Sequence, residues 1–304
     1  VIDPADAAMI RGFLINKFRG DPALFEDGYA QIAALSGWRG MGVVPWLDAV
    51  ARLPSEDAVV LERRAPSVDA PLVIACPVLP RISNFDDLDP LKLEPSVELR
   101  MIGPGQVIPA DAALVILPGS KATIADMRAM VAQGWDIDIR AHHRRGGVVL
   151  GICGGYQMLG RTIGDPEGIE GPPETIAGLG LLEVDTLMSS GKALHQVQGH
   201  GLEADFRGYE MHMGATSGPD CARPFAILDG GRADGAISRD GRVLGSYVHG
   251  LLASAPLRDA LMQRLGGQSA MADYAQTVGD ALDEVAALLE QHADIDAMVA
   301  LAMA

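Results

Sequence analysis

The sequence predicts an α/β fold, in which a mostly parallel sheet is covered by helices on both faces. Short apolar runs of the buried-strand type, such as those at residues 72–75 and 148–152, alternate with segments of helical apolar spacing. The composition agrees, because hydrophobic residues make up 48% of the chain and aromatic residues only 5%. With 36 glycines as well, this mixture suits layered α/β packing better than an all-β sandwich.

The expected elements follow one another in an alternating order. Strands are predicted where short apolar runs end in turns, and helices where apolar residues recur every three or four positions. In the helix expected at 123–133, Thr123 is a candidate N-cap and Gly134 a candidate stop. Such alternation implies right-handed crossovers and a sheet buried on both faces. The expected strands are 12–17, 41–45, 72–75, 97–102, 112–117, 148–152, 225–228 and 242–248, and the other expected helices are 27–35, 156–159, 256–265, 278–290 and 295–304.

The length of 304 residues suggests about two domains. The first β–α–β string has the pattern of the end of a parallel α/β domain whose beginning is absent. Residues 48–70 are polar, charged and proline-containing, as a connection between domains would be. We therefore expect a remnant and linker at 1–68, the main α/β domain at 69–265, and a helical C-terminal tail at 266–304.

The charge balance argues against two classes of partner. With 24 Lys+Arg against 40 Asp+Glu, the net charge of −16 offers no electrostatic footprint for nucleic acid or an anionic membrane. We expect no secretory leader and no segment that crosses a bilayer. The cysteines, Cys76, Cys153 and Cys221, are too few and too widely spaced for a disulfide framework or a zinc site. A cytoplasmic protein without a bound metal is therefore predicted.

The strongest local signal is the segment at 151–157, which reads Gly-Ile-Cys-Gly-Gly-Tyr-Gln. An apolar strand leads into it and a helical pattern leads out, which is typical of a nucleophile elbow with cysteine in place of serine. The glycines permit a sharp turn and a close approach of strand and helix. An elbow would expose the Cys153 sulfur at the C-terminal edge of the sheet, where open α/β folds bind ligands. A lone cysteine is more often buried and structural, but the glycine framing favours the nucleophile.

A cysteine nucleophile needs a base and hydrogen-bond donors for the oxyanion. His249 directly follows the strand at 242–248, so it should emerge at the same sheet edge as Cys153. The backbone N–H of Gly154 is placed to donate to the oxyanion. Gly119, in the turn after the strand at 112–117, is the candidate second donor, although an ordinary βα turn explains that glycine equally well.

These segments together resemble the class I glutamine amidotransferases, and among them the cobyric acid synthases. The resemblance lies in residues 151–157, in Leu-Pro-Gly-Ser-Lys at 117–121 and in Tyr-Val-His-Gly at 247–250. Three further segments, at 14–21, 80–91 and 208–214, resemble stretches characteristic of cobyric acid synthases in particular. The likeness runs from about residue 12 to about residue 258 and so covers most of the chain.

The resemblance implies a flavodoxin-like amidotransferase fold in which Cys153 attacks the side-chain amide of glutamine and His249 shuttles the proton. It further implies that Gly119 and Gly154 donate to the oxyanion and that Gln157 helps to hold the glutamine. Ammonia would then pass to a synthetase domain that activates carboxylates with ATP and Mg²⁺. In this family the acceptor is a corrin, adenosylcobyrinic a,c-diamide, which is amidated at four propionates to give cobyric acid in cobalamin biosynthesis.

One departure from the wider class concerns the residue that orients the histidine. Most class I amidotransferases carry Glu two residues after it, whereas this chain has Leu251, and the cobyric acid synthase branch resembles this chain in lacking that Glu. Glu210 is a hypothetical substitute. With Tyr209 and His212, Glu210 is also a candidate contact to the corrin, and an ordered turn beside a strand explains these three residues as well.

The second departure is the missing phosphate-binding loop with which the P-loop-type synthetase domain of this family begins. Residues 1–68 are therefore expected to be only the C-terminal remnant of that domain, with Asn16 as a tentative nucleotide contact. We expect no cofactor on this chain, and ATP and Mg²⁺ only in the complete enzyme. The chain is then a truncated piece, or its missing half is a separate chain.

Three other functions compete with this interpretation. A glutaminase subunit of a different amidoligase, such as one acting on cell-wall precursors, is disfavoured by the segment at 80–91. A non-catalytic module that binds glutamine or docks a partner would explain the missing Glu, but not an intact elbow with His249. A cysteine-dependent hydrolase or protease on a similar sheet would not explain Gln157 after the elbow.

Overall fold

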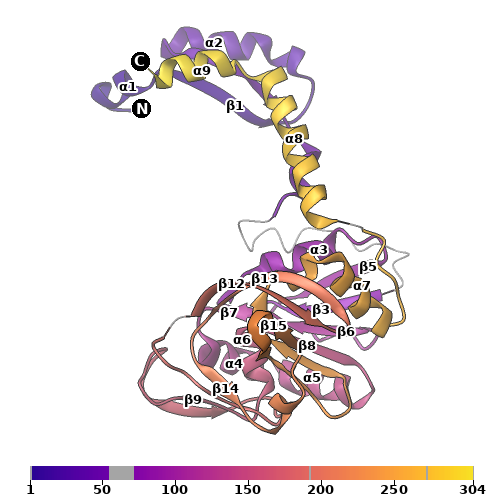
Figure 1. Cartoon of the computed structure of the whole chain (residues 1–304). Helices are drawn as coiled ribbons and strands as arrows, with labels where there is room; N and C mark the ends of the chain where they lie inside the picture. Colours follow the sequence, from indigo (N-terminus) through magenta and orange to yellow (C-terminus); the bar gives the residue numbers. More distant parts are fainter. Residues whose placement is uncertain (1, 55–71, 192, 272, 304) are drawn as a thin grey trace. The chain divides into compact units, whose positions relative to one another are not determined.

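A computed structural model describes residues 2–54, 72–191, 193–271 and 273–303 of the chain (Figure 1). The chain divides into two compact units. The large unit comprises Pro54–Tyr274, and the small unit comprises Val1–Leu53 together with Ala275–Ala304. Most of the connection predicted at 48–70 lies outside the described residues, although Asp48–Arg52 form a short 3-10 helix, η2.

The large unit is built around a six-stranded sheet in the order β17-β18-β8-β6-β3-β5. Five of its strands run parallel, and β17 pairs antiparallel with β18 at one edge. The predicted mostly parallel sheet is therefore confirmed. Its strands are β3 (Leu72–Pro77), β5 (Val97–Ile102), β6 (Leu114–Leu117), β8 (Val148–Ile152), β17 (Ala236–Ile237) and β18 (Val243–Ser246).

Helices cover both faces of this sheet. Helices α4 (Thr123–Ala132), α5 (Trp135–Arg144) and α6 (Gly154–Leu159) contribute buried side chains to one apolar cluster. Helices α3 (Asp89–Lys92) and α7 (Ala255–Arg264) contribute to the other. Two covered faces explain why the strands are continuous apolar runs with no polar alternation.

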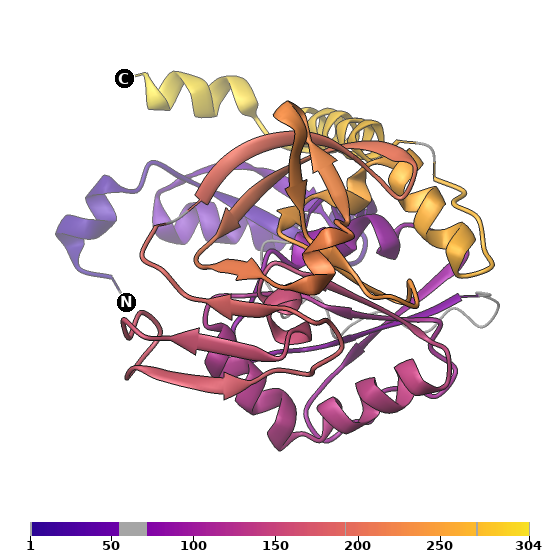
Figure 2. The ribbon, with the colours of Figure 1, turned by 60° about the horizontal axis from the view of Figure 1, so that its bottom comes forward.

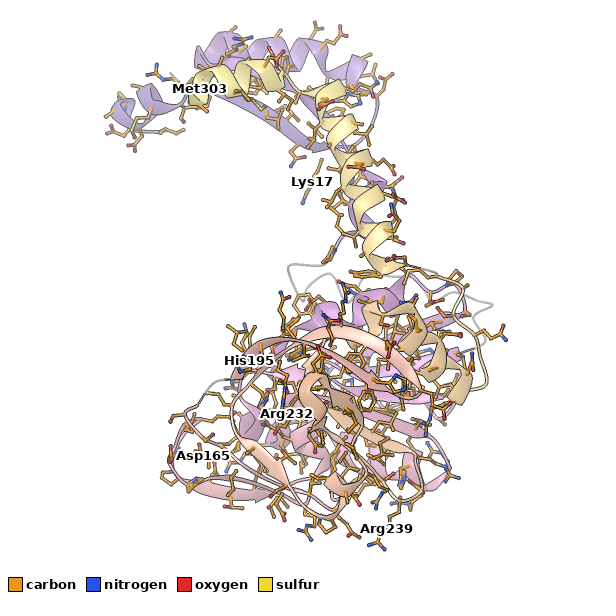
Figure 3. All side chains as sticks on the ribbon, in the orientation of Figure 1. Lys17, Asp165, His195, Arg232, Arg239 and Met303 are labelled. Atoms are coloured by element: carbon orange, nitrogen blue, oxygen red, sulfur yellow. The ribbon has the colours of Figure 1, made fainter. Side chains whose placement is uncertain are left out.

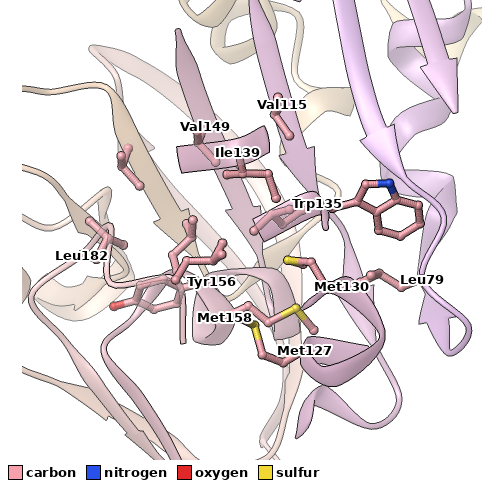
Figure 4. Packing of buried hydrophobic residues seen from close by; sticks show 14 of the residues in the cluster. Leu79, Val115, Met127, Met130, Trp135, Ile139, Val149, Tyr156, Met158 and Leu182 are labelled. Atoms are coloured by element: carbon pink, nitrogen blue, oxygen red, sulfur yellow. The ribbon is translucent and has the colours of Figure 1, made fainter. Parts of the chain in front are cut away.

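Neighbouring residues of the central strands divide between the two clusters. Val115 and Val149 belong to the cluster under α4 and α5, where Figure 4 shows them beside Ile139 and Trp135. The next residue of β8, Leu150, belongs to the opposite cluster. This alternation is what successive side chains of a strand must show, since they point to opposite faces of the sheet. Both faces of each strand are thus anchored, which fixes where the strand ends at the site lie.

A mostly antiparallel layer, in which only β9 and β11 pair in parallel, lies within residues 162–249, and of its strands the sequence analysis anticipated the one at 225–228. Its five-stranded sheet has the order β16-β15-β12-β13-β19, and a four-stranded sheet has the order β10-β9-β11-β14. The longest hairpin, β12–β13, forms a curved ribbon in Figure 2. The strands are β9 (Thr162–Asp165), β10 (Glu174–Ala177), β11 (Asp185–Leu187), β12 (Ala193–Gly201), β13 (Ala204–His212), β14 (Ala215–Ser217), β15 (Ala226–Leu228), β16 (Arg232–Asp234) and β19 (Val248–His249).

Short elements complete the edge of the main sheet where its strands end. β4 (Ile82–Ser83) pairs antiparallel with β7 (Gly119–Ser120), and the 3-10 helix η4 (Phe85–Leu88) follows. Helix η7 (Leu251–Ala253) comes directly after the β19 histidine and its neighbouring glycine. The other short helices are η5 (Pro219–Ala222) and η6 (Asp229–Gly231).

The small unit pairs β1 (Gly12–Phe18) with β2 (Arg39–Pro45) in parallel, as the first β–α–β string predicts. Its helices are α1 (Pro4–Met9), η1 (Pro22–Phe25), α2 (Glu26–Ser36), α8 (Tyr274–His292) and α9 (Ile295–Ala302). The C-terminal helices join β2, where Asp294 N donates to Met41 O at 2.7 Å and Gly42 bridges to Ala293. The tail expected as one piece at 266–304 is thus divided between the two units.

The start of α4 differs from the prediction. The N-cap position is Ala122, which has no capping side chain, and Thr123 is the first helical residue. The carboxylate of Glu170 caps the helix, accepting hydrogen bonds from the backbone N–H groups of Thr123 at 3.0 Å and Ile124 at 2.9 Å. A carboxylate suits the positive end of a helix, but one that comes from so distant a segment is not visible in a local pattern.

Candidate active site

Cys153 lies at the turn between β8 and α6, in a backbone conformation that few non-glycine residues adopt. Its φ is 53° and its ψ is −110°. The adjoining glycines have no room for a side chain, because a Cβ on Gly155 would lie 2.1 Å from the carbonyl oxygen of Leu117. A Cβ on Gly151 would lie 2.6 Å from the carbonyl oxygen of Gly155. The turn has the geometry of a nucleophile elbow.

The sulfur of Cys153 is almost covered in this structure. Only 7% of the residue is exposed, and its Sγ donates to the carbonyl oxygen of Met211 at 3.5 Å. Met211 belongs to β13, so a strand of the antiparallel layer passes directly over the elbow. The sequence analysis named other residues of this segment, but it did not predict that the strand covers the nucleophile.

His249 lies at the same sheet edge, and Asp87 holds its ring. Nδ1 of His249 donates to Oδ2 of Asp87 at 2.7 Å, and the backbone N–H of Gly250 donates to Oδ1 at 2.6 Å. Both carboxylate oxygens of Asp87 are therefore committed to the segment that carries the histidine. His249 is 0% exposed and Asp87 5% exposed, so water does not compete for this pair.

The hypothesis that Glu210 orients His249 is corrected by this geometry. Asp87 of η4 occupies that role, while the carboxylate of Glu210 pairs with Arg232. Leu251 stands where most class I amidotransferases have Glu. Its side chain is apolar and buried in the core, so it cannot accept a hydrogen bond from His249. A sequence signal for Asp87 existed, because it follows the end of β3 at the edge where Cys153 was expected.

The protonation of His249 follows from these contacts. Burial alone would lower the pKa of the ring, but its hydrogen bond to Asp87 and the nearby Cys153 sulfur raise that pKa to about 10. The imidazole is then charged at neutral pH. A charged imidazole beside a cysteine stabilises the thiolate, which is the form that attacks carbonyl carbon. Nε2 of His249 is buried without a well-formed hydrogen bond among the described residues, so it is available for proton exchange.

Tyr209 covers the face of the His249 ring. The two rings stack with centroids 5.3 Å apart and an interplanar angle of 23°. The Tyr209 hydroxyl accepts a hydrogen bond from Nδ2 of Asn84 at 2.7 Å. Asn84 is the residue that precedes η4, so one short segment holds the histidine in the ring plane through Asp87 and over the ring face through Tyr209.

The two predicted oxyanion donors lie next to each other and to the catalytic pair. A Cβ on Gly119 would lie 3.1 Å from Cε1 of His249, and a Cβ on Gly154 would lie 3.0 Å from the backbone nitrogen of Ser120. Asp126 orders this loop, since Oδ2 accepts from Ser120 Oγ at 2.6 Å and Oδ1 from Arg81 N at 3.1 Å. The structure thus brings Gly119 and Gly154 together at the elbow, where both were expected.

Gln157 lies behind the elbow and has its own partners. Its Oε1 accepts from Thr123 Oγ1 at 2.9 Å, and its Nε2 donates to the Met213 carbonyl at 2.9 Å and to the Tyr247 hydroxyl at 3.3 Å. The side chain is 2% exposed. Both the oxygen and the nitrogen of its amide are engaged, so Gln157 connects Thr123, Met213 and Tyr247 around the elbow. Gln157 would therefore help to hold glutamine by positioning these neighbouring residues.

Asn16, the tentative nucleotide contact, lies in the small unit. It lies on β1, is exposed, and accepts a hydrogen bond from the backbone of Lys17 at 2.8 Å. Searches of the described residues find no cluster of three or more His, Cys, Asp and Glu side chains that could hold a metal ion. Within the same residues, every helix is too short or too polar to cross a membrane.

A cysteine elbow with a carboxylate-held histidine is shared by many hydrolases and transferases, so the geometry alone does not name a substrate. The sequence model of the CobB/CobQ-like glutamine amidotransferase domain matches residues 73–257. The chain belongs to this family. The matched range includes Cys153, His249 and Asp87.

The chain is also similar to longer curated proteins. It is 68% identical over 304 residues to the cobyric acid synthase of Rhizorhabdus wittichii, covering 100% of this chain and 63% of that protein. It is 65% identical to the cobyric acid synthase of Novosphingobium aromaticivorans, covering 100% of this chain and 62% of that protein. The solved structure of PurLQS from Thermotoga maritima is 19% identical, with a TM-score of 0.47, and covers 69% of this chain and 99% of that one.

Proposed function

We propose that the large unit hydrolyses glutamine to glutamate and ammonia, with Cys153 as the nucleophile and His249, held by Asp87, as the proton carrier. One observation supports this most strongly: a strained cysteine elbow and a charged, buried histidine lie together in a CobB/CobQ-like glutamine amidotransferase domain. Family membership supplies the amide substrate, and the geometry supplies the reacting groups.

The proposed reaction has two steps. The Cys153 thiolate forms a bond to the side-chain carbonyl carbon of glutamine, His249 gives its Nε2 proton to the amide nitrogen, and the carbon–nitrogen bond breaks to release ammonia. His249 then takes a proton from water as that water attacks the thioester. Loss of the sulfur gives glutamate and restores the thiolate beside a charged histidine. The balance is glutamine and water to glutamate and ammonia.

Each tetrahedral intermediate carries a negative oxygen that needs donors already in place. We assign this role to the backbone N–H groups of Gly119 and Gly154, whose α-carbons lie close to His249 and to the Ser120 loop. The network of Asp126 and Ser120 keeps the loop fixed, so the donors need not reorganise during the reaction.

For the whole protein we propose the cobyric acid synthase reaction, in which the ammonia is used to amidate corrin carboxylates in cobalamin biosynthesis. The support is the 68% identity to the cobyric acid synthase of Rhizorhabdus wittichii, of which the chain spans 63%. ATP and Mg²⁺ would act in the part of such a protein that this chain does not span, with residues 1–68 as the remnant of that synthetase domain. We also propose a cytoplasmic location, since Cys76, Cys153 and Cys221 are all free thiols.

A diazo-ketone analogue of glutamine tests the proposed hydrolysis directly. The folded protein is treated with the analogue and the adduct is mapped by peptide mass spectrometry, with Cys76 and Cys221 as internal controls. Labelling of Cys153 alone, prevented by glutamine, is the expected result. Labelling of all three cysteines alike, or protection of none by glutamine, would show that this chain does not bind glutamine at the elbow.

A further inference from the structure

Arg258 of α7 is completely buried, which is unusual for an arginine. Its side chain and that of its partner, Glu94, are both 0% exposed, and Nε of Arg258 donates to Oε1 of Glu94 at 2.8 Å. By contrast, Arg232 and Arg239, which Figure 3 labels, keep 53% and 73% of their side chains exposed. Charged side chains are almost never fully buried unless they are paired. The proposed hydrolysis gives this buried pair no role.

The guanidinium of Arg258 is held in one geometry by its partners. Its Nη1 donates to the carbonyl oxygen of Leu252 at 2.8 Å, and its Nη2 donates to the carbonyl oxygen of Met271. A guanidinium is rigid and planar, so hydrogen bonds from all three of its nitrogens fix both its position and its plane. The Leu252 carbonyl and the Glu94 carboxylate are therefore tied to each other through one rigid group.

Glu94 is charged in spite of its burial. Its Oε2 accepts from the backbone N–H of Ala270 at 2.9 Å, and its Oε1 also accepts from the hydroxyl of Ser269. Burial alone would raise the pKa of this carboxyl group, but hydrogen bonds from Ser269, Ala270 and Arg258 lower it. A buried ion pair often stabilises a fold no more than apolar side chains of similar volume. Stability alone therefore does not explain why a charged pair occupies this place.

The ion pair connects the same two segments as the hydrogen bond between Asp87 and His249. Asp87 belongs to η4, which continues directly into α3, and Glu94 follows α3. On the other side, η7 comes directly after the histidine segment and contains Leu252. Both η4 and α3 contact η7. The two segments are thus joined twice, once by Asp87 to His249 and once by Glu94, through Arg258, to Leu252.

The turn between His249 and Leu252 is short and bonded at both ends. The backbone N–H of Gly250 donates to Oδ1 of Asp87 at 2.6 Å, and the carbonyl oxygen of Gly250 accepts from the backbone N–H of Ala253 at 3.1 Å. Gly250 has a φ of 77°, a conformation that favours glycine. Because this turn has little freedom, a shift of Leu252 would displace His249 relative to Asp87.

We propose that Glu94 and Arg258 are positioning residues for the proposed glutamine hydrolysis, on which this inference rests. The ion pair holds η7 against α3 and thereby sets the distance between Asp87 and the ring of His249. Both residues act through the histidine, and neither is a catalytic residue. Loosening the pair should therefore slow the chemistry while glutamine still binds.

Arg258→Lys tests this role, because it keeps the charge and removes the planar fork. A lysine ammonium can pair with Glu94, but it cannot replace all three nitrogens and hold the Leu252 carbonyl as well. We expect kcat for ammonia release from glutamine to fall about 10- to 100-fold, with KM changed less than about threefold. Glu94→Gln, which keeps the size of the side chain and removes its charge, should lose kcat in the same range.

The titration of His249 is a readout that a purely structural role would not change. The titratable groups that face its ring are Asp86, Asp87, Cys153, Tyr209 and His212. Burial lowers the pKa of the ring, whereas the hydrogen bond to Asp87 and the nearby Cys153 sulfur raise it to about 10. In Arg258→Lys and Glu94→Gln that pKa should be lower than in the wild type. NMR of protein labelled with ¹⁵N-histidine measures it, and His249→Gln identifies the signal.

Arg140→Lys is the matched control. Arg140 of α5, on the opposite face of the sheet, also pairs with a carboxylate and a backbone carbonyl. It donates to Asp136 at 2.6 Å and to the carbonyl oxygen of Leu179 at 3.1 Å. Since α5 does not belong to the two segments that the ion pair joins, this replacement should leave kcat within about twofold. The pKa of His249 should also stay unchanged.

A double variant keeps the test available if Arg258→Lys does not fold. Arg258→Met combined with Glu94→Gln buries no unpaired charge, so it avoids the largest cost of breaking a buried ion pair. Because both changes break the same link, the double variant should lose about as much kcat as Glu94→Gln alone.

Two outcomes would overturn the proposal. One is a lower Tm in Arg258→Lys and Glu94→Gln with unchanged kcat and an unchanged pKa of His249, which would make the pair a structural brace. The other is a loss confined to KM. Either result leaves the wild-type protein active on glutamine, whereas failure of the proposed hydrolysis would appear as no ammonia release by the wild type. The NMR titration needs no turnover and so reports on the position of His249 in both cases.

Discussion

Asp87 and His249 are separated by 162 positions in the sequence, yet their side chains form a 2.7 Å hydrogen bond at 5% and 0% exposure. Asp87 reaches the histidine because η4 follows β3 at the sheet edge where β19 also ends. Oδ1 of Asp87 also accepts a hydrogen bond from the backbone N–H of Gly250 at 2.6 Å. One carboxylate thus fixes the orientation of the ring and the turn that follows it.

Replacement of Asp87 should therefore slow the chemistry more than it weakens substrate binding. Asp87→Asn keeps the size of the side chain but cannot hold a charged imidazole in the same way. We expect kcat for glutamine hydrolysis to fall by about 100- to 10,000-fold, with KM changed much less. Ammonia release measures both constants, and Asp86→Asn, at the exposed neighbouring position, is the matched control. Wild-type kcat in Asp87→Asn would remove Asp87 from the catalytic machinery.

The raised pKa of His249 gives activity an alkaline limit. With that pKa at about 10, the ring keeps its proton at neutral pH and loses it as the pH rises through about 10. Since the protonated ring donates to the leaving nitrogen, kcat/KM should decline over that range. Asp87→Asn removes the hydrogen bond that raises the pKa, so its decline should begin at lower pH. Profiles from pH 6 to 11 make the comparison, and coincident alkaline limbs would contradict this assignment.

The same shift links the pair to stability. A histidine whose folded pKa lies above its unfolded value binds its proton more tightly in the native state. The stabilisation is therefore complete below the unfolded value of about 6.5 and is lost as the pH rises towards about 10. Thermal unfolding of wild type and Asp87→Asn should differ most near pH 6 and converge near pH 10. A gap that widens with pH would have the wrong sign for this pair.

Tyr209 should contribute through its ring more than through its hydroxyl. Tyr209→Phe keeps the stack on His249 and loses only the hydrogen bond from Asn84, so we expect kcat within about threefold of wild type. Tyr209→Leu also loses the stack and should fall by about tenfold. Asn84→Gly, which also suits the left-handed backbone of this residue (φ 52°), should match Tyr209→Phe and add little to it, because both remove the same bond. Full additivity of the two changes would mean that the bond plays no part.

Local sequence patterns were sufficient for the elbow and the histidine. Cys153 is flanked by Gly151, Gly154 and Gly155, a pattern typical of a nucleophile elbow. His249 directly follows an apolar strand. Asp87 has no such local mark, since it is one of several aspartates in a polar stretch and acts through a contact that only the folded sheet creates. The clue was indirect: Leu251 stands where the class usually has Glu, so the carboxylate had to come from another strand end.

The antiparallel layer was missed for a different reason. Strand β12 has exposed residues on both faces over Leu194, His195 and Gln196, so its alternation carries no clear apolar signal. Its pairing with β13 depends on residues up to 19 positions apart, from Ala193 to His212. As a result, the sequence indicated Cys153 and His249 but neither Asp87 nor the strand that covers the cysteine.

Gly155 gives a test of the elbow that needs no substrate. A Cβ there would lie 2.1 Å from the Leu117 carbonyl oxygen, which belongs to β6 and cannot move without distorting the sheet. Gly155→Ala should therefore cost at least about 1–3 kcal/mol, or roughly 5 °C in Tm for a unit of this size. Gly171→Ala, where a Cβ would meet nothing within 4 Å, is the matched control and should leave Tm within about 1 °C. If Gly155→Ala has the same Tm as Gly171→Ala, strand β6 and helix α6 are not in the close contact that this turn requires.

A Gly155→Ala protein that has a lower Tm but still folds at low temperature allows a second measurement. Its Cys153 should be alkylated at a different rate from that of the wild type, because the strained backbone that orients the sulfur has changed.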